Sequence, residues 1–339
     1  MRRRSFIVGL GSAAAWPVVA RAQQPDRMRR VAVLMALGEN EAASRVFLSA
    51  LMQGLSELGW SDGRTLRIDV RWAASNVDRM RMLAKEVVDL KPDMILTDAT
   101  PVTAAVQRET RTIPIVFVFV SDPIGSGFVA SLPRPGGNIT GFSPDDPRMG
   151  GKWLQLLTEI APGVKRAAFM FNPDTAPYVS SYYLPSFEAA ARTINVTPII
   201  AAVRGDAEIE AVISSLGQEA AGGLVSMADN FMLTRRALIV SLAARNNVPA
   251  VHYDAYFVRD GGLLSYGADE VDSFHRSASY VDRILRGTKP AELPVQLPTK
   301  FVMAINLKTA KALGLTIPET LLATADEVIQ TADFHCGTW

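Results

Sequence analysis

The chain has little of what metal or thiol chemistry needs. Its 339 residues include one cysteine and three histidines. Cys336 has no partner for an intrachain disulfide. His252, His275 and His335 lack the spacing of metal ligands, and neither an HExxH nor a CxxC motif occurs. We therefore expect no metal site.

Motifs that hold nucleotides or activate a serine are also missing. The sequence GSGFVA at 125–130 has the glycine spacing of a dinucleotide fingerprint, but PRPGG follows too soon for the required helix. The lysine of Gly150-Gly151-Lys152 is followed by Trp153, so this is not a phosphate-binding loop. No GxSxG motif occurs. These absences favour a binding protein without a cofactor over an enzyme.

The chain also lacks a strong charge and, beyond residue 22, a long hydrophobic run. Its formal net charge is +1, and without residues 1–22, which contain four arginines and no acid, it becomes −3. Nothing here favours a nucleic-acid partner. A membrane helix needs roughly 18 apolar residues, whereas the best candidate, IPIVFVFV at 113–120, has the length of a strand. We expect a soluble mature protein.

The N-terminus has the pattern of an export signal. Residues 2–4 are arginine, residues 6–19 are mostly apolar, and Ala-Arg-Ala at 20–22 offers small residues for cleavage. We expect cleavage near Ala22 and a periplasmic location. The pair Arg3-Arg4 also suits the twin-arginine (Tat) pattern, so export by the Tat or the Sec route stays open.

From residue 31 the chain alternates short apolar runs with amphipathic stretches, as parallel sheets with crossover helices do. The first run predicts strands at 31–37, 66–72, 94–99, 113–120 and 139–142, with helices at 42–58, 76–90 and 101–110. The second run predicts strands at 166–172, 196–203, 222–229, 248–254 and 262–267, with helices at 180–194, 207–217 and 233–246. Two similar runs imply two α/β lobes.

The lobe boundaries follow from this repetition. The segment 143–151 has two prolines and two glycines, so we expect it to cross between lobes as neither helix nor strand. The helix expected at 270–286 has no strand beside it in the second run and should pack on the first lobe. We assign lobe 1 to 30–143 with about 268–290, lobe 2 and a closing segment to 144–267 with about 291–329, and a C-terminal tail to 330–339.

Polar residues follow six of the expected strands. In such sheets, ligands lie outside the C-terminal strand ends or between domains. The strand ends in question are 38–40, 98–101, 121–123, 172–175, 229–230 and 253–255, and they are rich in Asp, Asn, Ser and Thr. Any one of them could simply form a turn. Six in succession favour a cleft for a small zwitterion or a hydroxylated molecule.

Several of these stretches resemble one protein family. TDATPVTAAVQ at 97–107 opens a similar region that continues to residue 142, followed by FNPDTAPY at 171–178, MADN at 227–230 and the tail at 284–329. In order and spacing they resemble the ABC-transporter substrate-binding family that includes tryptophan- and phenylalanine-binding members, a branch of the type I periplasmic-binding-protein fold.

The resemblance implies two Rossmann-like lobes, joined by crossing strands, that close on a ligand and deliver it to the membrane subunits of an ABC permease. We expect such a receptor to be a monomer. It implies that the strand at 302–306 belongs to the final crossing region and the helix at 307–313 to the closing segment.

Matched motif by motif, the resemblance also implies ligand-binding residues. They are Asp98, Thr100, Ser121, Asp122, Asn172, Tyr178, Asp229, Asn230, Tyr253 and Asp254. Asp229 is the leading candidate to bind a ligand ammonium group, and Thr100 with the following amides a carboxylate. Asp122 is expected to fix the turn at Pro123, and Tyr253 to stack on the ligand.

The expected function is capture of an amino acid or related small carboxylate for an ABC importer. The first loop, at 36–44, lacks the Thr and His-Pro elements of members that bind aromatic amino acids, so other solutes, including aromatic acids, stay open. One alternative is a sensory module that signals to a membrane partner, which co-purification with a kinase would favour. Another is an exported α/β enzyme, which turnover of a bound compound would identify.

Overall fold

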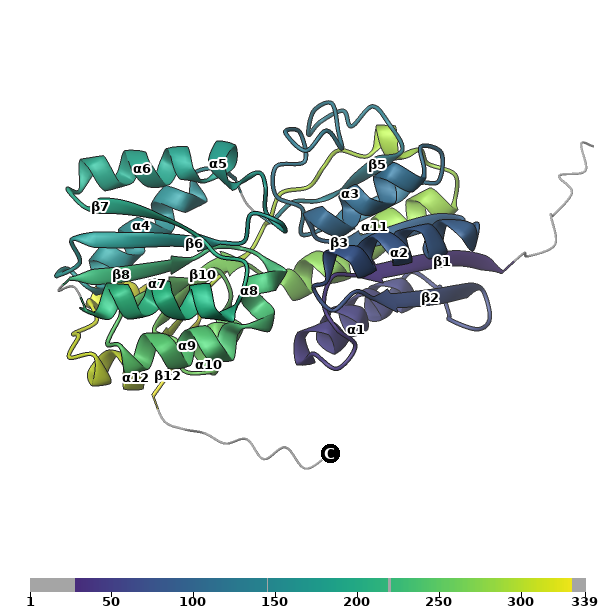
Figure 1. Ribbon diagram of the computed structural model, residues 1–339. Coiled ribbons are helices and arrows are strands. Elements are labelled where there is room, and N and C mark those ends of the chain that lie inside the picture. The colour runs from purple at the N-terminus through teal and green to yellow at the C-terminus, as the bar shows by residue number, and fades with distance from the viewer. Residues whose placement is uncertain (1–27, 145, 219–220, 331–339) are drawn as a thin grey trace, which may run out of the picture.

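The structure is a computed structural model that describes residues 28–144, 146–218 and 221–330. In this part of the chain two α/β lobes lie side by side (Figure 1). The expected signal peptide at 1–22 and the tail from residue 331 lie outside the described residues. Among the described residues, no helix is both long and apolar enough to cross a membrane.

The first lobe contains a five-stranded parallel sheet in the order β2-β1-β3-β4-β5. Its strands are β1 (Arg29–Met35), β2 (Leu66–Trp72), β3 (Met94–Asp98), β4 (Ile115–Val118) and β5 (Ile139–Phe142). The helices that connect them are α1 (Ala42–Glu57), α2 (Val77–Asp89) and α3 (Thr100–Glu109). Every residue of β3, β4 and β5 is buried, as in a parallel sheet covered by helices on both faces.

The second lobe contains a seven-stranded sheet in the order β12-β11-β10-β9-β8-β6-β7. Its strands are β6 (Arg166–Phe171), β7 (Thr197–Ala202), β8 (Gly222–Ser226), β9 (Ala250–His252), β10 (Leu264–Ala268), β11 (Phe301–Asn306) and β12 (Glu327–Ile329). β10 pairs antiparallel with β11, and the other neighbours are parallel. The helices of this lobe are α4 (Met149–Ile160), α5 (Val179–Tyr182), α6 (Leu184–Thr193), α7 (Asp206–Gln218), α8 (Asn230–Thr234), α9 (Arg236–Arg245), α10 (Ala255–Arg259), α12 (Leu307–Ala312) and α13 (Glu319–Thr324).

Three segments connect the lobes, at 143–148, 268–270 and 296–300, and together we call them the hinge. The first and third run side by side, because the backbone N–H of Ser143 donates to the Gln296 carbonyl and the Gln296 N–H donates to the Gly141 carbonyl, both at 2.9 Å. The short 3-10 helix η1 (Pro290–Glu292) precedes the third segment.

Helix α11 (Glu270–Leu285) follows the second hinge segment and returns to the first lobe, where it packs on α1. The rings of Phe47 and Phe274 stack with their centroids 5.0 Å apart. Trp60 donates a hydrogen bond from its indole nitrogen to Asp282 at 2.9 Å. These contacts hold α11 against the helix α1 and the loop that follows it.

The prediction for 143–151 is wrong at its end, because Met149, Gly150 and Gly151 form the first turn of α4. Glycine disfavours a helix by about 1 kcal/mol relative to alanine. Because of the two glycines, the sequence analysis did not predict a helix here. Glycine is needed at these two positions because α4 packs closely against α6. A Cβ atom on Gly150 would clash with the Tyr183 carbonyl, and one on Gly151 would lie 2.9 Å from the Ser186 carbonyl oxygen.

Several short elements also differ from the prediction. The helix expected at 180–194 is divided into α5 and α6, and the one at 233–246 begins earlier, as α8, before α9. The sequence analysis missed α10, α13 and β12. Each has at most six residues, which is too short for a periodic pattern to stand out.

The close approach of α4 and α6 yields a test. We expect Gly150→Ala to lower the free energy of unfolding by roughly 1–3 kcal/mol, because overpacking outweighs the better helix propensity of alanine. Urea unfolding of the mature protein measures this change. Gly163→Ala is the control, because nothing lies within 4 Å of a Cβ atom there among the described residues. Stabilisation by Gly150→Ala would contradict the packing argument.

Candidate functional site

Polar side chains from both sheets gather between the lobes, where the strands end. Asp98 ends β3, Thr100 begins α3 and Ser121 follows β4. From the second lobe, Asn172 follows β6 and Asp229 precedes α8. These five residues, together with Tyr253 after β9, are each at most 9% exposed.

The lobes touch one another around these residues. Ser121 Oγ and the Tyr183 hydroxyl share a hydrogen bond of 2.8 Å. At the outer edge, Arg236 of the second lobe lies 3.6 Å from the carboxylate of Glu41. Tyr183 was not predicted as a site residue, because it falls within an expected helix and only the tertiary fold brings it to Ser121.

Asp98 and Asn230 face one another from opposite lobes. Asp98 accepts a hydrogen bond from the Ala36 N–H at 3.2 Å. Burial raises the pKa of Asp98 to about 7, although the Ala36 N–H and the nearby Asn230 amide act to lower it. Within the described part of the chain, the buried Nδ2 of Asn230 has no hydrogen-bond partner. A buried amide and a buried acid thus lie close together across the two lobes.

Asp229 is held by its own lobe. Its carboxylate accepts hydrogen bonds from Thr175 Oγ1 at 2.6 Å and from the Phe231 N–H at 3.0 Å, and the second of these caps α8. Burial raises the pKa of Asp229 to about 6 against these hydrogen bonds. The Tyr253 hydroxyl donates to the Asp229 backbone carbonyl at 3.3 Å. The carboxylate is therefore fixed in position, and its hydrogen bonds together with the positive charge of Arg235 offset its burial only in part.

Tyr253 lies among the acidic groups of both lobes. Burial raises the pKa of this tyrosine, and so do the surrounding negative charges, which are those of Glu270, Asp254, Asp229 and Asp98. Its ring lies 6.4 Å, centroid to centroid, from that of Phe119 in the first lobe. The predicted residues Asp98, Asp229 and Tyr253 are therefore brought together by the fold.

Three predicted residues have a local structural role. Asp122 adopts φ +48° and accepts a hydrogen bond from the Gly125 N–H at 2.8 Å, which agrees with the turn role expected for it. Asn172 accepts one from the Asp174 N–H at 2.8 Å. Asp254 caps α10 by accepting one from the Tyr256 N–H at 2.7 Å. Contact of these three with a ligand stays a prediction.

The two remaining predicted positions flank this group. Thr100 begins α3 and donates a hydrogen bond from its hydroxyl to the Ser121 carbonyl at 3.4 Å. Tyr178 is half-buried beside α5, and its ring packs edge-on against Tyr183 at 6.2 Å. Thr100 thus lies beside Ser121, whereas Tyr178 reaches the site through Tyr183.

A cavity of about 440 Å³ opens between the lobes at one edge of this region. Its lining comes from both lobes: Gly38, Glu41, Ala74, Ser75, Asn76, Asp206, Thr234 and Arg235. In the described ranges, no three His, Cys, Asp or Glu side chains are grouped so that they could hold a metal ion. The region is a polar cleft lined from both lobes.

Sequence reasoning missed Glu270, the first residue of α11. It is 5% exposed, and burial together with the charges of Asp254 and Asp98 raises its pKa. The acidic pair at 269–270 follows the strand expected at 262–267, so the rule used for the other strand ends would have found it.

Comparisons with known proteins agree with this architecture. A family model described as ABC transporter substrate binding protein matches residues 30–329. A tyrosine-binding protein of Clostridioides difficile is 26% identical over 264 residues, which cover 78% of this chain and 75% of that protein. A crystal structure of a conserved domain protein from Vibrio cholerae aligns at 29% identity with a TM-score of 0.82, over 89% of this chain and 100% of that one.

A crystal structure of an ABC domain from Streptococcus pneumoniae in complex with L-Trp aligns with the same TM-score of 0.82 and the same coverage, at 25% identity. These matches confirm the expected fold class and the family resemblance found in the sequence.

The raised pKa of Asp98 predicts a pH dependence of stability. Between the pKa of an unfolded aspartate, about 3.9, and the folded value of about 7, the native state holds a proton that the unfolded chain has released. Stability contributed by this group is therefore present at low pH and lost as pH rises.

We compare the free energy of unfolding of Asp98→Asn with that of the wild type. We expect the advantage of the variant to grow by about 2–4 kcal/mol from pH 4 to pH 8. Urea unfolding of ligand-free protein at several pH values measures the difference. Asp78→Asn serves as the control, because the Asp78 side chain is 90% exposed. A difference between Asp98→Asn and the wild type that does not change with pH would refute the assignment.

Proposed function

This chain belongs to the ABC transporter substrate binding protein family, and from this premise we propose that it captures an amino acid between its lobes and presents it to an ABC permease. A related small carboxylate is the other ligand that the site would accept. Substrate-binding proteins of this family are typically extracytoplasmic. We place this one in the periplasm, with the segment at 1–22 as its export signal.

One observation supports the proposal: buried acidic groups of both lobes meet in the cleft, and burial raises the pKa of Asp98 and of Asp229. Asp98 of the first lobe lies near Asn230 of the second lobe. Asp229 lies near Tyr253, and both belong to the second lobe. Leaving a buried polar group unpaired costs about 1–3 kcal/mol, and more if it is charged. A ligand with an ammonium group would supply donors to the carboxylates and compensate their charge.

The first lobe offers a place for the carboxylate group of such a ligand. Thr100 begins α3, whose first-turn N–H groups point out of the helix end. A helix N-terminus with a hydroxyl group beside it favours a carboxylate. An amino acid carries both charges on groups bonded to one carbon atom, and the matches include a tyrosine-binding protein and a structure in complex with L-Trp.

Closure of the lobes would carry the signal to the permease. A ligand held from both sides stabilises the arrangement in which Ser121 meets Tyr183 and Glu41 meets Arg236. When the lobes separate, these contacts break, and a permease can therefore distinguish the two states. Binding and release, without turnover, are sufficient for this role.

Calorimetric titration with a panel of amino acids and small carboxylates tests the ligand site. We expect Asp229→Asn to weaken the best ligand by roughly 10–100-fold, because a charge-assisted hydrogen bond is lost. Thr100→Val should weaken it by a smaller factor. Asp174→Asn, on an exposed neighbouring turn, is the matched control. The proposed site is wrong if both Asp229→Asn and Thr100→Val bind the ligand as tightly as the wild type.

A double-mutant cycle tests the contribution of closure. Ser121→Ala, Tyr183→Phe and their combination together isolate the hydrogen bond between the two hydroxyl groups. In the free energy of ligand binding we expect a coupling of about 1 kcal/mol, because the bond joins opposite lobes. If the two substitutions prove additive, closure does not depend on this contact.

A further inference from the structure

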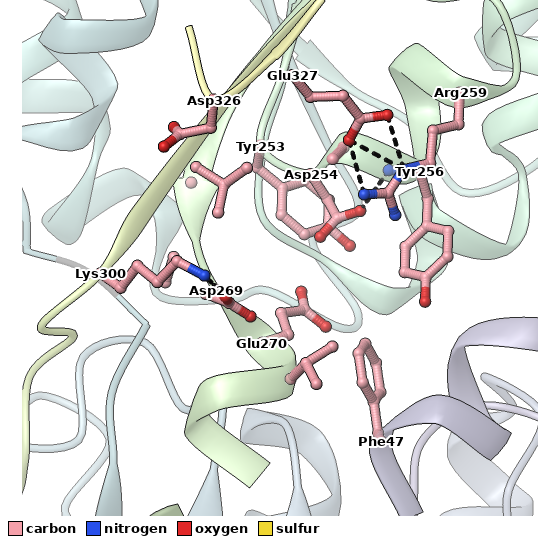
Figure 2. Close-up of a pocket in the computed structure, with 15 residues that line it drawn as sticks. Phe47, Tyr253, Asp254, Tyr256, Arg259, Asp269, Glu270, Lys300, Asp326 and Glu327 are labelled. Carbon is pink, nitrogen blue, oxygen red and sulfur yellow. Dashed lines mark hydrogen bonds and ion pairs between the residues drawn. The ribbon is translucent and has the colours of Figure 1, made fainter. Parts of the chain in front are cut away.

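A second cavity, of about 340 Å³, lies beside the hinge where β10 passes into α11 (Figure 2). Phe47 of α1 borders it from the first lobe. We call this cavity the hinge pocket, and its labelled lining residues are Phe47, Tyr253, Asp254, Tyr256, Arg259, Asp269, Glu270, Lys300, Asp326 and Glu327. It shares no lining residue with the cavity at the edge of the cleft, although Tyr253 and Asp254 also belong to the predicted ligand-binding residues.

Acidic groups outnumber basic groups in the hinge pocket, with five carboxylates and two cations. Both cations are already engaged. Arg259 pairs with Glu327 at 2.7 Å, and Lys300 pairs with Asp269 at 2.6 Å. Arg259 and Arg236 also act on Asp254 and lower its pKa, so Glu270 is the acid left without a lining cation in the described part of the chain.

Glu270 is the lining residue whose surroundings most favour a bound cation. Its side chain points into the pocket in Figure 2, and the residue is 95% buried, being 5% exposed. Among the described residues, Glu270 Oε1 has no hydrogen-bond partner. Asp254, beside it, uses one oxygen to accept the Tyr256 N–H at 2.7 Å. Two neighbouring carboxyl groups thus face a cavity with acceptor capacity unused.

The remaining walls select the kind of cation. Phe47, Tyr253 and Tyr256 present aromatic rings, and Val271 and Val302 add apolar surface. Aromatic faces attract organic cations, whereas a metal ion needs converging oxygen ligands. In the part that the structure describes, no three acidic, His or Cys side chains are arranged for a metal.

We propose that the hinge pocket binds a small primary alkylammonium ion, with its charged nitrogen at Glu270 and Asp254 and its alkyl chain against Phe47 and Tyr256. A free small amine is small enough for the hinge pocket and for reaching the buried side chain of Glu270. Because Phe47 comes from the first lobe and Tyr256 from the second, a bound amine contacts both. The inference does not rest on the ligand proposed for the cleft.

An NMR titration of the mature protein with propylammonium tests the proposal, with propan-1-ol as a neutral probe of similar size. We expect saturable binding of propylammonium and none of propan-1-ol. Glu270→Gln, which keeps the shape and removes the charge, should weaken propylammonium by about tenfold or more. Glu319→Gln, exposed on α13, is the control and should bind like the wild type.

Asp229→Asn separates this pocket from the cleft. This variant should retain propylammonium binding even if it loses the amino acid ligand. If the wild type binds propylammonium but no amino acid, the proposed function is wrong and the hinge-pocket proposal stands. The hinge-pocket proposal is overturned if propylammonium does not bind saturably, if propan-1-ol binds equally well, or if Glu270→Gln binds as the wild type does. Loss of amine binding in Asp229→Asn but not in Glu270→Gln would place the amine in the cleft and overturn it as well.

Discussion

Burial of acidic side chains between two lobes is the constraint on which the rest of the structure depends. Asp98, Asp229 and Glu270 are each more than 90% buried, and burial raises the pKa of each. Removing carboxylates from water is costly unless donors or positive charge replace the water. The protein supplies only part of that replacement, so a cationic group bound between the lobes would complete it.

The fold places these acids between the two lobes. In parallel sheets the carboxyl ends of the strands lie on one edge, and the two sheets turn those edges toward each other. The return of α11 to the first lobe fixes Glu270 at the hinge, since Phe274 stacks on Phe47. The polar contacts between lobes are few enough to break, as a receptor that opens and closes requires.

Much of this arrangement could be predicted from the sequence, because apolar periodicity marks the buried strands and polar residues mark their ends. Asp98 and Asp229 were found in this way. Helix α4 was missed because its glycines serve tertiary packing against α6, which local propensity does not reveal. Tyr183 was missed because its hydrogen bond to Ser121 joins residues distant in the chain. Glu270 was missed although it follows the strand expected at 262–267, because the strand-end rule was not applied there. Asp122 illustrates the converse, since its turn is local and was predicted correctly.

The most direct test of the account is proton release on ligand binding, measured by calorimetry at pH 6 in buffers with different ionisation enthalpies. If the ammonium group of the ligand compensates Asp98 and Asp229, their raised pKa values must fall on binding. At pH 6 Asp98 is about nine-tenths protonated and Asp229 about half, so the account predicts release of about 1 to 1.4 protons per ligand bound. Binding with no proton release, or with uptake, would contradict it.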